Sequence, residues 1–360
     1  MLLLRHVGLA GLVLAIAMGA VALGDGPSGD RTEVRPASTS RQAGPTYKVQ
    51  AGIDGEIYPV FANFASLQGL TQRTFGMVAV TISNPTQAAL RQRVVVSLPG
   101  WSDEEIQIAD VDPGATRTLL FAPPFLPRLY HNREIIAATA RVSVSPMTGN
   151  PQYESTTPVR LRSAEDIYWG ANFKYAPFIA SWVTPHDALV ERLLAEAKQY
   201  TPDKRLPGYE TWKTWAQQEQ ESYTEAKAIF TAVKQAGLSY VKSSLTLGDH
   251  QSMSERVRMP NVSLAHLSAN CIDAAVMYAS MFENLAMEPS IILVPGHAYV
   301  GVKVAEGSDK LLYIDVAMTG RMTFEQAVAS AQAGMEKQDA ASVTQINVSA
   351  ARSVGIYPMP

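Results

Sequence analysis

The stretch Ser268–Val304, SANCIDAAVMYASMFENLAMEPSIILVPGHAYVGVKV, decides the fold of the C-terminal half of this chain. Its first part has apolar residues at helical spacing, at positions 272, 275, 276, 279, 282 and 285, and Pro289 ends that pattern. Two apolar runs follow, SIILVP and AYVGVKV, and the dipeptide Pro295-Gly296 between them is a turn signal. The stretch therefore predicts a helix that leads into an antiparallel strand pair.

Three residues of this region carry side chains that could act together. Cys271 falls in or next to the first turn of the predicted helix, where unpaired N–H groups and the helix dipole favour a thiolate. His297 begins the second strand, and Asp315 stands near the end of a third predicted strand, LLYIDV. A thiol, a base and a carboxylate that orients the base are the parts of a nucleophilic site. We therefore predict Cys271, His297 and Asp315 as catalytic residues, with Asp273 and Ser268 as first-turn and cap groups.

These residues resemble the motifs of the transglutaminase-like superfamily, which is related to papain-like cysteine proteases. The matching segments are Ala269-Asn270-Cys271-Ile272-Asp273, Gly296-His297-Ala298-Tyr299-Val300 and Tyr313-Ile314-Asp315. Two features depart from the family pattern. Ala269 stands where Gly is frequent, and Tyr313 matches the family's aromatic residue before the Asp but stands at a slightly different distance from it. The resemblance covers residues 256–320 and implies a Cys-His-Asp triad that attacks amide or related acyl groups.

The second oxyanion donor, beside the backbone N–H of Cys271, stays open at this point. Gln251 and then Asn270 are candidates for a side-chain donor, although a surface role for Gln251 is the simpler interpretation. A metal site made of His250, His266 and His297 is the weaker alternative, because no H-E-x-x-H motif or Cys pair accompanies these residues. We therefore expect neither metal nor cofactor.

Helical periodicity recurs on both sides of this region. Residues 186–200 and 219–235 predict two helices before it, and residues 322–337 predict an Ala-rich closing helix with a packing role. Helices followed by a strand pair indicate an α+β domain. We assign residues 186–360 to this transglutaminase-like, papain-like cysteine domain.

Residues 47–163 differ, because short alternating runs separated by turn signals predict half-buried antiparallel strands. The predicted strands lie in residues 77–86, 91–101, 105–114, 116–124, 134–146 and 156–163. Many short strands at such spacing favour a β-sandwich domain. The expected fold class is thus α+β, an N-terminal β-sandwich followed by the α+β cysteine domain. The aromatic-rich connector, residues 164–185, is expected to pack the junction rather than to bind sugar rings.

The chain begins with features of export. Residues 1–24 have an apolar run after Arg5 and His6 and predict a signal peptide, or alternatively an N-terminal membrane anchor. Residues 25–46 are polar and predict a disordered linker. These segments predict a periplasmic, cell-surface or secreted protein, or, in the anchor alternative, a protein that the N-terminal segment tethers to the membrane. With one Cys among 360 residues, the chain has no internal disulfide.

Composition narrows the function further. A net charge of −3 offers no basic field for phosphates, so nucleic acid is not an expected partner. No Gly-rich phosphate loop or Ser nucleophile elbow is present in the sequence. The leading hypothesis is an exported cysteine-dependent amide hydrolase or acyltransferase acting on a peptide or protein. The alternative is a non-catalytic peptide- or protein-binding module that retains the fold; oligomeric state stays open.

Overall fold

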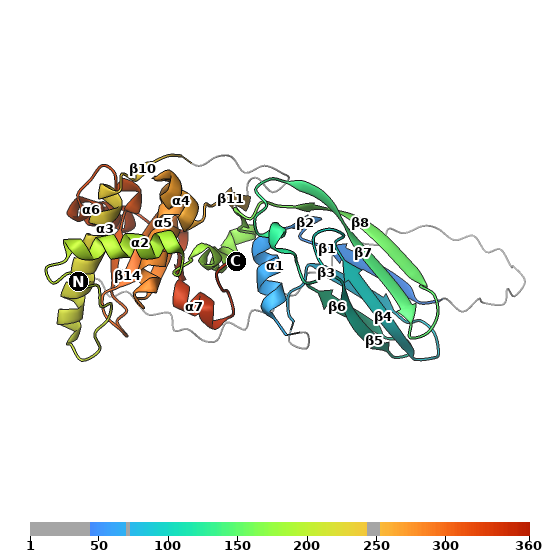
Figure 1. Ribbon diagram of the computed structural model, residues 1–360. Helices are drawn as coiled ribbons and strands as arrows, with labels where there is room; N and C mark the ends of the chain where they lie inside the picture. Colours follow the sequence, from blue (N-terminus) through green and yellow to red (C-terminus); the bar gives the residue numbers. More distant parts are fainter. Residues whose placement is uncertain (1–43, 70–72, 243–252) are drawn as a thin grey trace, which may run out of the picture.

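The fold is α+β, and the computed structural model describes residues 44–69, 73–242 and 253–360. Figure 1 shows the β-rich half of the chain on the right and the helix-rich half on the left, with α1 (Pro59–Leu67) and α7 (Val348–Ser353) between them. The predicted leader, residues 1–24, and nearly all of the predicted linker lie outside the described residues. Among the residues that are described, no helix is long and apolar enough to cross a membrane.

The β-rich half contains two main sheets. One has the strand order β1-β3-β6 and the other has the order β2-β8-β7-β4-β5. Neighbouring strands are antiparallel except for β2 and β8. The bounds of the strands are β1 Thr46–Ala51, β2 Glu56–Ile57, β3 Val78–Ser83, β4 Leu90–Ser97, β5 Glu105–Val111, β6 Thr116–Phe121, β7 Ile136–Pro146 and β8 Tyr153–Leu161. All six strands predicted from alternation are therefore confirmed.

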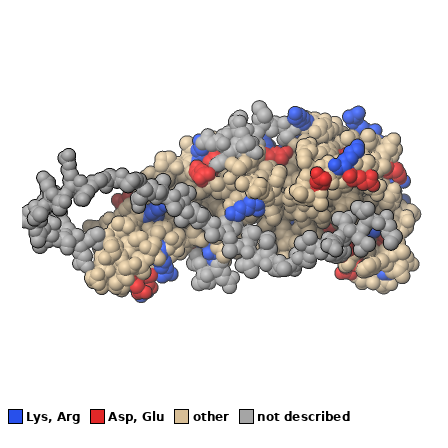
Figure 2. Space-filling model, turned by 180° about the vertical axis from the view of Figure 1, so that it is seen from behind, with Lys and Arg blue, Asp and Glu red and all other residues tan. Residues whose placement is uncertain are grey.

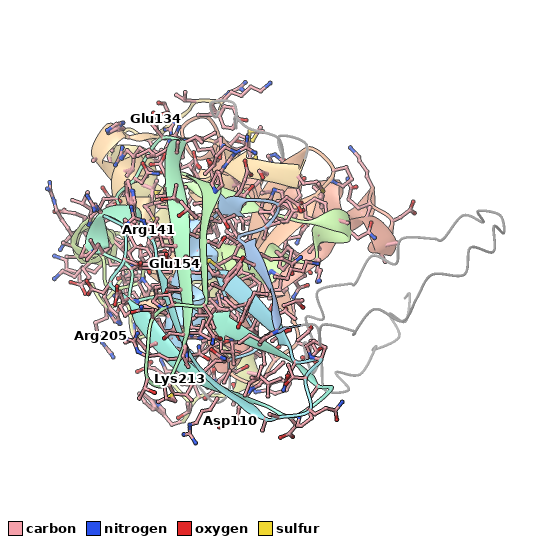
Figure 3. The ribbon with its side chains drawn as sticks, turned by 90° about the vertical axis from the view of Figure 1, so that its right-hand side faces the viewer. Asp110, Glu134, Arg141, Glu154, Arg205 and Lys213 are labelled. Carbon is pink, nitrogen blue, oxygen red and sulfur yellow. The ribbon has the colours of Figure 1, made fainter. Side chains whose placement is uncertain are left out.

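The alternation of buried and exposed side chains along each strand explains how these sheets form a core. Val80 of β3, Val94 of β4 and Val144 of β7 are completely buried and belong to one apolar cluster, although they come from both sheets. On the opposite face of the larger sheet, Arg141 and Glu154 are exposed, as Figure 3 shows along β7 and β8. Each strand thus buries one row of side chains and leaves the other row in water.

The connector packs the junction between the two halves, as its sequence predicts. Its rings at Tyr168, Trp169, Phe178 and Trp182 are buried, whereas Phe173 is exposed. Phe178 contacts Phe61 of α1 with ring centroids 4.8 Å apart. Helix α1, which packs against this cluster, was not predicted. Its sequence PVFANFASL has apolar residues on nearly every side and therefore shows little helical periodicity.

Strand pairing and buried charges also join the halves. Strand β9 (Asp166–Tyr168) pairs antiparallel with β11 (Ser254–Arg256), which directly precedes the Cys271 region. Beside it, the guanidinium of Arg162 is fully buried between the carboxylates of Glu56 and Asp166, at 3.5 and 2.9 Å. A buried charge needs such partners to offset lost hydration.

The C-terminal half surrounds a four-stranded sheet with the order β15-β14-β13-β16. Its strands are β13 Pro289–Val294, β14 His297–Lys303, β15 Leu311–Ile314 and β16 Thr344–Asn347, and two-residue strands β10 Ser239–Tyr240 and β12 Ser268–Ala269 pair beside it. Its helices are α2 Ala188–Ala197, α3 Trp215–Gln235, α4 Pro260–His266, α5 Cys271–Asn284 and α6 Phe324–Glu336. The three predicted strands and the four helices predicted from periodicity are confirmed, while β16 and α4 were not predicted.

Candidate active site

Cys271 is the first residue of α5, at the helix start that its sequence predicts. The preceding Asn270 caps the helix: its Oδ1 accepts from the backbone N–H of Asp273 at 2.8 Å, and Asp273 Oδ2 accepts from the N–H of Asn270 at 3.2 Å. This reciprocal capping box fixes where the helix begins. The Cys271 side chain is partly exposed, so a substrate can reach the sulfur at the positive end of the helix dipole.

The cap assignment corrects one expectation. Ser268, predicted as a cap group, instead lies in β12, and its hydroxyl accepts from the guanidinium of Arg258 at 3.1 Å. Asp273 is a first-turn residue, as predicted, and it is fully buried; its Oδ1 also accepts from the N–H of Arg258 at 2.8 Å. Burial raises the pKa of Asp273 above its ordinary value. Residues on both sides of Cys271 are thus held by buried polar contacts.

His297 and Asp315, which are 18 positions apart, meet in space. His297 begins β14 after a tight turn in which Gly296 has a φ of +74°, a conformation that suits glycine. Asp315 directly follows β15, the antiparallel neighbour of β14. The Nε2–H of His297 donates to Oδ1 of Asp315 at 3.0 Å. The other ring nitrogen, Nδ1, is therefore the one that can face a thiol.

Electrostatics link all three predicted residues. The pKa of His297 is raised from 6.5 to about 9, first by the hydrogen bond with Asp315 and next by the side-chain interaction with Cys271, while burial acts in the opposite direction. The Cys271 side chain thus acts on the imidazole together with Asp315, and the imidazole holds its proton at neutral pH. A protonated imidazole stabilises a thiolate and can deliver a proton to a leaving group.

Asp315 is itself held firmly. Its side chain is almost completely buried, and its Oδ2 accepts from the hydroxyl of Ser330 at 2.9 Å. Its backbone N–H donates to the carbonyl of Ala327 at 3.2 Å. Both partners belong to α6, which the sequence predicts only as a packing helix. Nothing in the local pattern around Ser330 signals this contact, because an Ala-Ser-Ala run in a helix is typical of packing alone.

Two tyrosines complete the surroundings of the site. Tyr299 touches His297 with ring centroids 4.7 Å apart in an edge-to-face arrangement. Tyr240 of β10 lies opposite Ala269 in the pairing with β12, two residues before Cys271. Its pKa is raised by burial and then by the charges of Cys271, Asp273 and Asp315. Sequence reasoning missed Tyr240, because a two-residue strand after a helix leaves no detectable periodicity.

The remaining candidates are the alternative oxyanion donors and the residues of the alternative metal site. Gln251 and His250 lie outside the described residues. The carboxamide oxygen of Asn270 caps α5, and a role for this side chain as an oxyanion donor stays a prediction. His266 is the last residue of α4 and is exposed. Within residues 44–69, 73–242 and 253–360, no group of three or more His, Cys, Asp or Glu side chains could hold a metal ion.

Surface charge shows no field of one sign on the face that Figure 2 displays. Lys and Arg side chains are interspersed with Asp and Glu side chains there. This distribution agrees with the small net charge of the chain. A protein that binds the phosphate backbone of nucleic acid usually has many Lys and Arg side chains on one face. That nucleic acid is not a partner stays a prediction.

Comparison with known proteins leaves the site to be interpreted from its own geometry: no protein family model matches the chain, and no curated protein matches it either.

Proposed function

We propose that this chain is a cysteine-dependent enzyme of the transglutaminase-like type, in which Cys271 attacks the acyl carbon of an amide or peptide. The observation that carries the proposal is the Nε2–Oδ1 contact of 3.0 Å between His297 and Asp315, and the raised pKa of the same imidazole includes a contribution from Cys271. A thiol, an imidazole and a buried carboxylate in this relation are what nucleophilic catalysis requires.

The reaction follows from the protonation states. The thiolate of Cys271 forms a bond to the substrate carbonyl carbon, and the negative charge moves to the carbonyl oxygen near the N–H of Cys271. As the carbon–nitrogen bond breaks, the imidazolium of His297 gives its proton to the departing amine. Neutral His297 then takes a proton from water or from a second amine. That nucleophile breaks the thioester and restores the thiolate–imidazolium pair.

The wider architecture supports this proposal without deciding the substrate. The arrangement of α5 before β13, β14 and β15 has the order of elements expected for a papain-like fold. The two sheets of residues 46–161 share one core, as the sheets of a β-sandwich do. We propose that this sandwich is a binding or spacer module and that the whole chain is exported, to the periplasm, the cell surface or the medium, where a peptide or protein is the substrate.

The test uses the only thiol of the chain. Because the sequence holds one Cys, a mass increase of the intact protein after treatment with iodoacetamide reports on Cys271 alone. We expect the alkylation rate to be high already near pH 6, and to depend on His297. His297→Ala should move the rise of the rate to the pH range of an ordinary thiol. Cys271→Ala, the matched control, should take up no label.

Turnover would then separate the reaction classes. A library of peptides incubated with the protein reports hydrolysis through new termini, and a fluorescent primary amine reports acyl transfer through its incorporation. Loss of both products in Cys271→Ala with an unchanged thermal midpoint would support the proposal. If the wild-type thiol reacts only like a free cysteine, and Cys271→Ala binds peptide as well as wild type does, the enzyme proposal fails and a binding module replaces it.

A further inference from the structure

We infer that helix α6 orients the imidazole of His297, with Ser330 and Gly334 as positioning residues that act through Asp315 and Tyr299. The inference rests on the proposed function, because it assigns a role to contacts behind the proposed triad. Neither residue touches the sulfur, and neither lies in the segment that resembles the transglutaminase-like family. Sequence periodicity alone predicts only packing for this helix.

The first contact runs through the carboxylate. Asp315 has two carboxylate oxygens: Oδ1 accepts from His297 at 3.0 Å, and Oδ2 accepts from the Ser330 hydroxyl at 2.9 Å. Because both oxygens have a partner, the plane of the carboxylate is fixed. The N–H of Asp315 also donates to the carbonyl of Ala327, one helical turn before Ser330. Because an orienting carboxylate works only in the correct plane, the helix decides how the imidazole is held.

The second contact runs through a tyrosine ring. The ring of Tyr299 touches the imidazole of His297 edge to face, and it is almost completely buried in a small cluster with Ile292 and Ala331. Its hydroxyl lies against Gly334, where a Cβ atom would stand only 2.2 Å from the Tyr299 Oη. Any side chain at position 334 would therefore displace the ring that supports the imidazole.

Gly334 is otherwise hard to explain. It lies inside α6, where glycine is unfavourable relative to alanine because it loses more backbone freedom and adds no packing. Its neighbours Ala331 and Ala333 show that small side chains are otherwise tolerated in this helix. The close approach of Tyr299 supplies the physical reason for glycine. The Ser330 hydroxyl and the absent side chain at Gly334 are separate features of α6, and both bear on how the imidazole of His297 is held.

Ser330→Ala tests the first contact. We expect the rate constant for alkylation of Cys271 at pH 7 to fall about three- to tenfold, and the pH profile of this rate to move to higher pH. The reason is that the Asp315 carboxylate loses the charge-assisted hydrogen bond that helps to hold it in place. Ser330→Thr keeps a hydroxyl and should recover most of the rate. The matched control is Ser353→Ala in α7, whose hydroxyl donates to the carbonyl of Ala350; its profile should equal that of wild type.

Gly334→Ala tests the second contact. Because the new methyl group would meet the Tyr299 hydroxyl, a purely structural role for this position predicts a lower thermal midpoint and an unchanged profile. We expect instead a shifted profile, and a partial return when Tyr299→Phe is added, since that change removes the hydroxyl that the new methyl group would meet. Folding of each variant is followed by circular dichroism over the same pH range.

The outcomes separate the two proposals. A wild-type profile that depends on His297, together with unchanged profiles in both Ser330→Ala and Gly334→Ala, overturns the inference about α6 and leaves the proposed function intact. A wild-type thiol that reacts like a free cysteine and ignores His297→Ala overturns both. Shifted profiles in the two variants, with recovery by Ser330→Thr, support α6 as the helix that orients the imidazole.

Discussion

Replacement of Asp315 by Asn tests the electrostatic coupling of the site most directly. The change keeps the shape of the side chain but removes its charge, and a neutral amide cannot stabilise an imidazolium as a carboxylate does. The hydrogen bond with Asp315 is the largest cause of the raised pKa of His297, which reaches about 9 in place of 6.5. Without it, we expect the pKa of His297 to fall by about one to two units towards its ordinary value.

The sign of the effect on stability follows from the same shift. A raised pKa in the folded protein stabilises the fold fully below pH 6.5, and this contribution is lost as the pH rises through about 9. One pKa unit corresponds to about 1.4 kcal/mol. The imidazole is partly exposed, so water screens the pair and about 1–2 kcal/mol is the expected loss at pH 6. At pH 10 the pH-dependent part of the difference between wild type and Asp315→Asn should vanish.

The assay follows His297 by NMR in protein labelled at histidine, with His297→Gln to assign its signal. Urea unfolding at pH 6 and pH 10 gives the stability difference, and alkylation of Cys271 gives the reactivity. Asp187→Asn is the matched control, because Asp187 caps α2 through its Oδ1 and asparagine caps equally well. An unchanged titration of His297 in Asp315→Asn would refute the coupling of these two residues.

Four further changes probe the site, the core and the junction. Cys271→Ser should abolish turnover with an unchanged thermal midpoint, because a hydroxyl is far less ionised than a thiol, whereas Asp315→Ala should leave a residual rate; peptide cleavage assays measure both. Burial raises the pKa of Glu225 to about 8, so folding favours its protonated form and its stabilising effect fades as the pH rises from about 4.5 to 8. Glu225→Gln should therefore raise the free energy of unfolding at pH 8 by about 1–2 kcal/mol and change it little at pH 4, which urea titrations at the two pH values would show. Arg162→Met should lower the free energy of unfolding by about 3–5 kcal/mol, because it leaves the buried carboxylates of Glu56 and Asp166 without their shared cation; a loss below 1 kcal/mol in chemical denaturation would contradict this.

Much of the fold could be predicted because the sequence patterns that indicate its strands and helices are local. Strands β3 to β8 were found because alternation with period two survives wherever one face of a sheet meets water, whereas β1 and β2 were not predicted. Helix α3 was recognised by its apolar stripe, although it begins at Trp215 rather than at position 219, since its capping box at Thr214 was not identified. Helix α1 escaped prediction, because a helix surrounded by protein shows no polar face.

The sequence predicts three candidate site residues but not the contacts that hold them in place. Cys271, His297 and Asp315 lie on elements with clear local signals: a capped helix start, a glycine turn and the end of a strand. Tyr240 and Ser330 carry no such signals. Their place beside the site depends on how β10 pairs with β12 and on how α6 lies against the end of β15.

The sequence by itself determined that α5 begins at or next to Cys271, although it predicted Ser268 as the cap where the structure has Asn270, and it determined the turn that precedes His297. Contacts within a few residues depend little on the rest of the chain, so their chemistry is legible in the residue order. Only the tertiary structure decided that α6 supports Asp315. Many helices could bury the same Ala-rich face, and the choice among them depends on packing between segments that are distant along the chain.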